Sequence, residues 1–218
     1  MKTQTYKVVE IFKSIEGEGS RAGVLATFIR LYGCNLRCTY CDTLYGIEGG
    51  NYTEMTLQDI MFELKRHKSQ FVTLTGGEPL IHENVHELID AITARGYFLN
   101  IETNGAVDVT PYLSNSKVLL TLDYKCPSSG MESKMLMTNF EYVRPKDVVK
   151  FVVGTTEDLD MAKEVIQHYG LHNTYLSPVF GKIEPKDIVQ YMIDNHLYDT
   201  KIQLQLHKYI WDPEMKGV

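Results

Sequence analysis

The sequence has little tryptophan, cysteine or basic charge, and it has no long apolar segment. No apolar run approaches the roughly 20 residues that a membrane-spanning helix needs, which argues against a membrane protein. The formal net charge is −6, so the chain lacks the basic excess with which proteins attract nucleic acids through the phosphate backbone. Four cysteines in 218 residues are too few for a disulfide framework. We therefore expect neither a membrane nor a direct nucleic-acid partner.

The composition is that of an ordinary folded chain, with 44% hydrophobic and 23% charged residues. A length of 218 residues fits one domain, residues 1–218, with enough chain for a sizeable core. The first seven residues carry charge without an apolar stretch behind it, which argues against a signal peptide. Cysteines that are clustered and not spread for disulfides favour a reducing compartment, so we expect a cytoplasmic location.

Three of the four cysteines, Cys34, Cys38 and Cys41, lie within eight positions in the spacing C-x3-C-x2-C. Thiolates are soft ligands that select zinc, Cu(I) or iron–sulfur clusters. A structural zinc site needs four protein ligands, and no fourth Cys or His follows at a suitable spacing nearby. The pattern also differs from that of bacterial ferredoxins. Three thiolates would leave one iron of a cubane open, although a zinc site and a group of buried thiols remain alternatives. Cys126 is distant and precedes a proline, so we expect it to be spare.

This spacing, with an aromatic residue before the last cysteine, resembles the signature of the radical S-adenosylmethionine (SAM) enzymes. The resemblance implies that Cys34, Cys38 and Cys41 hold a [4Fe-4S] cluster whose remaining iron is chelated by SAM. It also implies that Thr39 and Tyr40, inside the cysteine loop, lie beside SAM.

Apolar patterns along the chain alternate between strand-like and helix-like segments. A series of such units with short connections predicts an α/β fold with a mostly parallel, curled sheet. A complete eight-unit barrel typically takes about 250 residues, so we expect a partial barrel of about six β/α units. The predicted strands are 6–12, 26–33, 71–75, 97–105, 117–123, 147–153, 173–178 and 201–206, and the predicted helices are 56–65, 85–94, 158–169 and 185–195.

Several predicted strands end in polar or glycine-rich residues, at the edge where α/β barrels place their chemistry. A double glycine after a strand lets the backbone approach a ligand closely. The resemblance to radical SAM enzymes implies that these strand ends bind SAM. The residues concerned are Gly76, Gly77, Glu78, Glu102, Asn104, Asp123, Tyr124 and Lys125.

A second, narrower resemblance covers the chain from about residue 6 to its end. The segments 14–19, 28–38, 41–43 and 205–208 look like those of the 7-carboxy-7-deazaguanine synthases. The resemblance implies ring contraction of 6-carboxy-5,6,7,8-tetrahydropterin with loss of ammonia, on the pathway to queuosine, a tRNA modification, and related deazapurines. It also implies Mg²⁺ beside SAM and the cluster.

The loop at 14–19 and an arginine inside a strand suit a small polar substrate. Carboxylate and backbone groups can pair with the amino-pyrimidinone edge of a pterin, and the guanidinium of Arg30 matches a carboxylate. Mg²⁺ takes few protein ligands and keeps waters and substrate oxygens, in keeping with the hydroxyl of Thr43. The family resemblance implies further contacts, and the full substrate set is Ile15, Glu16, Gly17, Glu18, Arg30, Thr75, His207 and Val218.

Each of these assignments has a structural alternative. The loop at 14–19 could be a solvated turn, Arg30 could pair with a structural carboxylate, and Thr43 could cap a turn. The aromatic tail, residues 207–218, could be a surface latch or could close the active site. The chain also departs from the family pattern, because Glu16 stands where many members have Gln, and Asp123-Tyr124 precedes Lys125 where a Ser-Pro pair is usual.

Two other classes compete with the synthase. A radical SAM activase would generate a glycyl radical on a partner enzyme, and an iron–sulfur electron carrier or zinc-stabilised module would not bind SAM at all. The loop with Glu16 and Glu18, together with the histidine-bearing tail, favours a small polar substrate. For the synthase we expect an electron donor such as a flavodoxin, and a homodimer.

Overall fold

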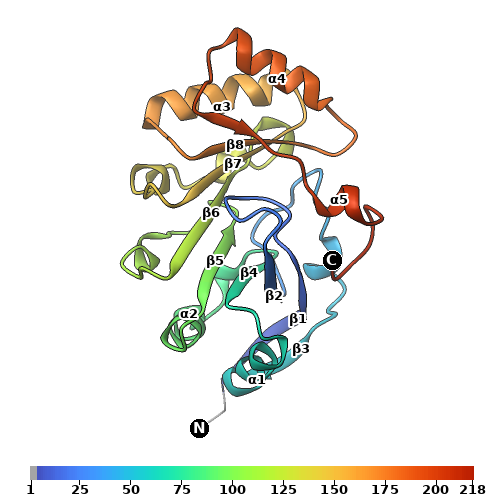
Figure 1. The fold of residues 1–218 in the computed structure, drawn as a ribbon, viewed down its shortest axis with the longest axis vertical. Helices are drawn as coiled ribbons and strands as arrows, with labels where there is room; N and C mark the ends of the chain where they lie inside the picture. The colour runs from blue at the N-terminus through green and yellow to red at the C-terminus, as the bar shows by residue number, and fades with distance from the viewer. Residues whose placement is uncertain (1–3) are drawn as a thin grey trace.

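The computed structural model describes residues 4–218; residues 1–3, part of the segment considered for a signal peptide, lie outside the described residues. The chain forms one curled, mostly parallel sheet with helices packed along its outer side (Figure 1). The predicted α/β fold is thus confirmed. No helix within residues 4–218 has the length and apolar character that crossing a membrane would take.

The nine strands of the sheet follow the order β3-β1-β2-β4-β5-β6-β7-β8-β9, and all pairs from β2 onward are parallel. The strands are β1 (Thr5–Ile15), β2 (Leu25–Leu31), β3 (Thr53–Thr56), β4 (Phe71–Gly76), β5 (Phe98–Thr103), β6 (Val118–Tyr124), β7 (Val148–Val153), β8 (Thr174–Pro178) and β9 (Thr200–Ile202). The helices are α1 (Leu57–His67), α2 (Val85–Ala94), α3 (Thr156–Tyr169), α4 (Pro185–Asp194) and α5 (His207–Ile210).

The structure differs from the predicted elements in four places, one of which is the short helix α5, which was not predicted. The N-terminal strands β1 and β3 are antiparallel to their neighbours, and β3 was not predicted, because four mostly polar residues carry no strand pattern. After β5 and β6 the chain makes only 3₁₀ turns, not crossover helices. The last strand ends at residue 202, so the prediction of a strand through residue 206 was wrong for residues 203–206.

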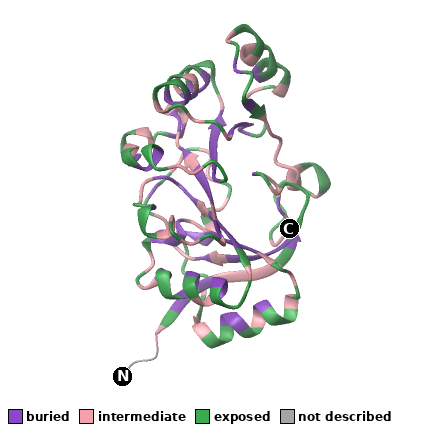
Figure 2. Cartoon of the chain, turned by 60° about the vertical axis from the view of Figure 1, so that its left-hand side comes forward, coloured by how far each residue is buried: buried purple, intermediate pink, exposed green. Residues whose placement is uncertain are grey.

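The two faces of the curled sheet differ in chemistry because successive side chains of a strand point to opposite faces. On β4 and β5, Leu74 and Ile101 belong to the apolar core shared with the helices. On the other face Asn100 accepts a hydrogen bond from the Thr121 hydroxyl, and Glu102 lines a cavity. Figure 2 shows buried residues concentrated in the strands and on the sheet-facing sides of the helices. The barrel interior is therefore polar, whereas the stabilising apolar core lies outside it.

Side-chain hydrogen bonds join the loop after β1 to the segment after β9. The amide of Gln203 accepts from the backbone N–H of Gly19 and donates to its carbonyl, over 2.5 and 3.0 Å. The backbone N–H of Leu206 donates to the carbonyl of Gly17 over 3.1 Å. The backbone N–H of Gln203 still bonds the carbonyl of Leu176 in β8, and the chain then turns from the sheet to hold this loop, which is why residues 203–206 do not continue β9.

Candidate active site

The three clustered cysteines surround one cavity at the C-terminal edge of the parallel strands. Cys34, Cys38 and Cys41 are free and partly exposed, and all three line this cavity, the cysteine cavity. The Asn104 amide donates to the Cys34 sulfur over 3.6 Å. The remaining lining residues are Leu36, Tyr40, Thr43, Ile47, Gly76, Gly77, Asn104 and Lys125. A set of three soft thiols with an open side fits a cluster that has one iron free for a ligand.

The charge state of the thiols depends on burial and on one nearby ammonium. Burial raises the pKa of Cys38, and the positive charge of Lys125 opposes that rise. Burial also raises the pKa of Cys41, and a backbone hydrogen bond from Thr43 opposes that rise. Because a thiol must lose its proton to bind a metal, Lys125 favours the ligating form.

Gly76 and Gly77 occupy positions where a side chain would not fit. A Cβ on Gly77 would lie 2.6 Å from Cβ of Cys34 and would overlap the carbonyl of Gly33. Gly76 has φ +152 and its Cβ would overlap the backbone of Leu31. The glycines therefore allow the end of β4 to pack directly against the start of the cysteine loop.

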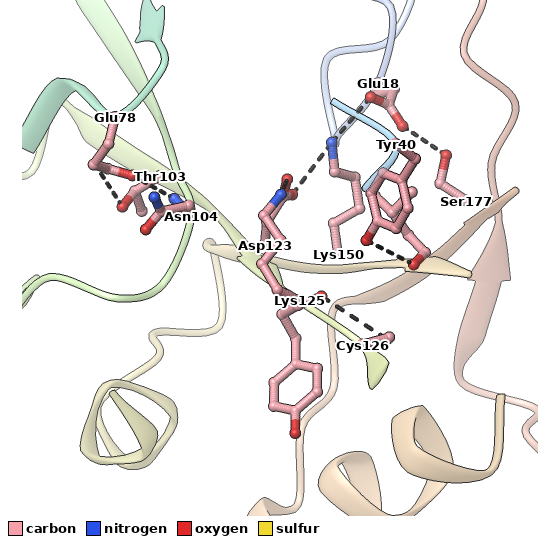
Figure 3. Close-up of polar contacts among 12 residues, drawn as sticks. Glu18, Tyr40, Glu78, Thr103, Asn104, Asp123, Lys125, Cys126, Lys150 and Ser177 are labelled. Atoms are coloured by element: carbon pink, nitrogen blue, oxygen red, sulfur yellow. Dashed lines mark hydrogen bonds and ion pairs between the residues drawn. The ribbon is translucent and has the colours of Figure 1, made fainter. Parts of the chain in front are cut away.

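Glu78 lies behind this edge and not in the cysteine cavity. Its carboxylate accepts from the Thr103 hydroxyl (3.0 Å) and the backbone N–H of Asn104 (2.6 Å) (Figure 3). It also accepts from the backbone N–H of Leu80 (2.9 Å). Burial raises the pKa of Glu78 to about 7, and these three hydrogen bonds oppose the rise. The carboxylate thus fixes the end of β5, including Asn104, whose amide reaches Cys34.

The other residues expected near SAM divide between the cavity and its surroundings. Lys125 lines the cysteine cavity and pairs with Asp123 over 2.8 Å. Tyr40 also lines it and donates its hydroxyl to the carbonyl of Val152 over 3.4 Å. Thr39 is exposed and donates its hydroxyl to the backbone carbonyl of Ser128, in the segment after β6. The ring of Tyr124 packs in the outer core against aromatic neighbours, so it faces away from the cavity.

A second cavity, the polar cavity, lies inside the barrel and shares Thr43 with the cysteine cavity. It brings together six of the eight residues predicted to bind substrate. Its lining residues are Phe12, Ile15, Gly17, Glu18, Phe28, Arg30, Asp42, Thr43, Glu102, Gln205, His207 and Val218. Two stacked aromatic rings, Phe12 and Phe28, are 5.0 Å apart and give it a flat apolar wall.

Arg30 pairs with a structural carboxylate and also faces the space for a ligand, which are the two roles predicted for it. Its Nε donates to Glu10 over 2.8 Å, and the same carboxylate oxygen accepts from the Tyr45 hydroxyl over 2.9 Å. The side chain also lines the polar cavity. A structural carboxylate therefore holds the guanidinium in place beside the space that a ligand would fill.

Glu16 and Thr75 do not line the polar cavity. Glu16 is 1% exposed, accepts from the Thr73 hydroxyl and pairs with Arg21 over 3.3 Å. The carboxylate of Glu16 therefore points away from this cavity, and the residue does not lie in a solvated turn. Thr75 is buried, and its side chain opposes the rise in the pKa of Glu102 that burial causes.

The buried position of Glu16 predicts a pH dependence of stability. Burial and the nearby charge of Glu102 raise the pKa of Glu16 from 4.5 to about 7, so the folded chain binds this proton more tightly than the unfolded chain. The contribution of Glu16 is then most favourable below pH 4.5 and falls as the pH rises to about 7, by up to about 3 kcal/mol. Glu16→Gln should flatten this fall, measured by denaturant unfolding at pH 5.5 and pH 8. Exposed Glu184→Gln is the control, and an unchanged pH dependence in Glu16→Gln would contradict the prediction.

The segment after β9 covers the polar cavity from the open side of the barrel. The imidazole of His207 lies so close to Gly17 that a Cβ at this glycine would overlap it. Burial lowers the pKa of His207, which favours the neutral ring. Lys208 pairs with Asp42 over 3.0 Å, next to Thr43 of the cysteine loop. Residues 213–218 line a further depression beside Arg30 and Thr43.

Thr43 itself donates its hydroxyl to Asp42 over 3.0 Å and makes no side-chain cap for the short turn that follows. Within residues 4–218, no three His, Cys, Asp or Glu side chains are grouped so as to hold a single metal ion. The hydroxyl lies at the junction of the two cavities.

Sequence reasoning did not single out several residues of the site. Lys150 is the clearest case, because a lysine inside the apolar run of β7 follows the same logic that identified Arg30. The glutamines and aromatic residues are not charged residues inside an apolar strand, so the sequence did not mark them in this way. The residues missed in this way are Glu10, Phe12, Phe28, Asp42, Tyr45, Lys150, Ser177, Gln203 and Gln205.

Comparison with known proteins defines the class first. Residues 28–192 match the family model of the Radical SAM superfamily, which is more than half of the chain, and the chain belongs to that superfamily. The structure of QueE from Escherichia coli superposes with a TM-score of 0.70 at 24% identity and covers 92% of this chain and 93% of that one. Streptococcus suis SuiB bound to S-adenosylmethionine has the related fold, with a TM-score of 0.57 at 13% identity, over 78% of this chain and 45% of that one.

Sequence relatives narrow the class to one enzyme family. The 7-carboxy-7-deazaguanine synthase of Clostridium acetobutylicum is 45% identical and covers 98% of this chain and 99% of its own length. That of Methanospirillum hungatei is 38% identical over 95% of this chain and 86% of its own length. The chain therefore belongs to the family of 7-carboxy-7-deazaguanine synthases.

Proposed function

We propose that this chain contracts the ring of 6-carboxy-5,6,7,8-tetrahydropterin to give 7-carboxy-7-deazaguanine with loss of ammonia. The observation that carries the proposal is the meeting of two cavities at Thr43: one with three free thiols, the other polar, with Arg30, Glu18 and a flat aromatic wall. The relatives named 7-carboxy-7-deazaguanine synthase support the same product. We infer that this product serves deazapurine and queuosine synthesis, the source of a tRNA modification.

Cys34, Cys38 and Cys41 would hold a [4Fe-4S] cluster with SAM on its open iron. When bound, these groups supply a 5′-deoxyadenosyl radical that takes hydrogen from the substrate. The protein's own part is to position the reactants and exclude water. Lys125 stabilises the thiolates, and Asn104 donates to the Cys34 sulfur from the end of β5.

The residues that line the cysteine cavity are the best candidates for direct contact with SAM. We assign that contact to the backbone of Gly76 and Gly77, which permits close approach, and to Tyr40, Asn104 and Lys125. Thr39 and Asp123 lie beside this cavity, and Glu102 lines the neighbouring polar cavity; these three residues complete the proposed set. Glu78 and Tyr124 would act by positioning, since the Glu78 carboxylate is fully engaged within the protein and the Tyr124 ring packs in the core.

The polar cavity suits a flat bicyclic substrate with a carboxylate. Arg30 would bind that carboxylate, while Glu18 and the backbone of Ile15, Glu16 and Gly17 would pair with the amino-pyrimidinone edge. Thr75, His207 and Val218 would complete the contacts, the tail closing the cavity. Mg²⁺ would bind the Thr43 hydroxyl together with substrate oxygens and waters.

Arg30→Met tests the assignment of the substrate carboxylate. Loss of a charge-assisted bond of about 1.5–3 kcal/mol should raise KM for the carboxypterin by roughly 10- to 100-fold, with SAM affinity nearly unchanged. Glu10→Gln should have a smaller effect in the same direction, because Glu10 only orients Arg30. Steady-state kinetics under anaerobic conditions gives KM for the carboxypterin and for SAM in each variant, and exposed Arg66→Met is the control. Equal loss of SAM and substrate affinity in Arg30→Met would argue against the assignment.

The reaction is tested by anaerobic reconstitution with iron and sulfide, followed by SAM and a reductant, with and without the carboxypterin. We expect SAM cleavage that depends on the pterin and yields 7-carboxy-7-deazaguanine, and an increase of turnover on adding Mg²⁺. Cleavage only in the presence of a partner protein would instead identify an activase. A protein that binds zinc and no SAM would overturn the proposal.

We further propose a flavodoxin as electron donor, a homodimer and a cytoplasmic location. Four unpaired thiols and a cluster that must be reduced support a reducing compartment. Light scattering of the reconstituted protein tests the dimer, and SAM cleavage with reduced flavodoxin tests the donor.

A further inference from the structure

Lys150 is a buried cation that the proposed contacts with SAM and substrate do not include. It lies in the middle of β7, is 7% exposed, and stands between Val149 and Phe151, which belong to the outer apolar core. Its side chain therefore points to the opposite face, into the barrel. A lysine is rarely buried unless it is paired, so its partners indicate its role.

Lys150 bridges two carboxylates that come from distant parts of the chain. Its Nζ donates to Glu18 Oε2 over 2.9 Å and lies 3.2 Å from Asp123 Oδ1 (Figure 3). The Asp123 pair follows from the sheet register, which places Asp123 beside Lys150 on adjacent strands. Glu102 is a third carboxylate close enough to affect the ammonium.

These carboxylates connect Lys150 to the two cavities, Glu18 directly and Asp123 through Lys125. Glu18 lines the polar cavity and is held there by the Ser177 hydroxyl, which donates to Oε1 over 2.6 Å, and by Gln205 at 3.4 Å. Asp123 accepts from Lys125 over 2.8 Å, and Lys125 lines the cysteine cavity. A continuous chain of charges thus runs Glu18–Lys150–Asp123–Lys125 between the cavities.

We propose that Lys150 is a positioning residue that holds Glu18 and Asp123 in place together and thereby couples binding of the carboxypterin to binding of SAM. The inference rests on the proposed function. Charge balance supports it: Glu18, Glu102 and Asp123 face Lys150 and Lys125, and without Lys150 three partly buried carboxylates would share one ammonium. Burial already raises the pKa of Glu102, and Lys150 opposes that rise. Removing the ammonium would release Glu18 from its place in the cavity.

The test compares Lys150→Met, Lys150→Arg and, as control, exposed Lys186→Met, all reconstituted anaerobically. Dissociation constants for the carboxypterin are measured with and without SAM. In the native protein SAM should tighten substrate binding. In Lys150→Met we expect substrate affinity to fall at least about tenfold and the effect of SAM to disappear, with iron content close to native and a lower melting temperature, because two ion pairs are broken. Lys150→Arg should restore part of the coupling, and Lys186→Met should behave as native.

A second variant keeps the inference testable if Lys150→Met does not fold. Glu18→Gln lies in the polar cavity, yet it should weaken SAM binding several-fold through Lys150, a readout that needs no substrate. Where both proteins fold, Glu18→Gln should add little to Lys150→Met, because both remove the same link. The inference is wrong if the native protein converts the carboxypterin while Lys150→Met and Glu18→Gln both bind SAM with native affinity and both keep the native effect of SAM on substrate binding. If the native protein does not convert the carboxypterin, the proposed function fails instead.

Discussion

Cys34→Ala, Cys38→Ala and Cys41→Ala are each expected to abolish SAM cleavage. Each variant leaves two thiols on the cysteine cavity, so the cluster loses one corner and a second iron is exposed to solvent and to chemical attack. We expect activity to fall by more than about a thousandfold, because the radical has no other source in this site. Iron and sulfide content, visible absorbance and 5′-deoxyadenosine production after anaerobic reconstitution measure the loss.

Cys126→Ala is the matched control for these variants. Cys126 is fully buried among apolar residues, and burial raises the pKa of its thiol well above the usual value, so it remains protonated. Removing the sulfur should cost about 1 kcal/mol of stability and leave the cluster content native. Loss of the cluster in Cys126→Ala, or full activity in any of the other three, would contradict the ligand assignment.

Gly77→Ala should be nearly as damaging, for a steric reason. The added methyl would lie 2.6 Å from Cβ of Cys34 and would overlap the carbonyl of Gly33, and backbone cannot move aside as a flexible side chain can. The cysteine loop must then shift away from β4, which displaces Cys34 relative to the other two thiols. We expect cluster content to fall several-fold and SAM affinity of the remaining clusters roughly a hundredfold. Iron analysis and equilibrium binding of SAM measure the two effects separately.

Gly154→Ala is the control for the glycine variant. This residue also follows a strand of the sheet, but a Cβ there would come no closer than 3.4 Å to a neighbour. We expect native iron content and little change in melting temperature. If Gly77→Ala has native cluster content and native SAM affinity, the cysteine loop can move to accommodate the methyl group, and the steric argument is refuted.

The parts of the site that the sequence predicts are those fixed by local spacing. Three cysteines within eight positions must share one loop, and Gly76-Gly77 after an apolar strand must lie at the edge of a parallel sheet. The strand order then brings these segments together, since the carboxyl ends of parallel strands meet at one edge.

Residues whose role depends on distant partners were harder to predict. The loop holding Glu16 looks solvated in sequence because its neighbours are glycine and acid, but Thr73 and Arg21 bury it. Alternating Gln and Leu at 203–206 has the period of a strand, yet after the backbone N–H of Gln203 bonds β8, its side-chain amide bonds the loop at 14–19. In both cases the deciding contact joins segments far apart along the chain.

The hydrogen bonds between Gln203 and Gly19 join residues 184 positions apart, and this has a consequence for synthesis on the ribosome. The loop at 14–19 leaves the exit tunnel early, but Gln203, which anchors it, is translated 184 positions after Gly19. Closing such a long loop is slow compared with forming local structure. The nascent chain can therefore assemble β4 to β8 before this loop is anchored, and we expect the polar cavity to acquire its final shape last.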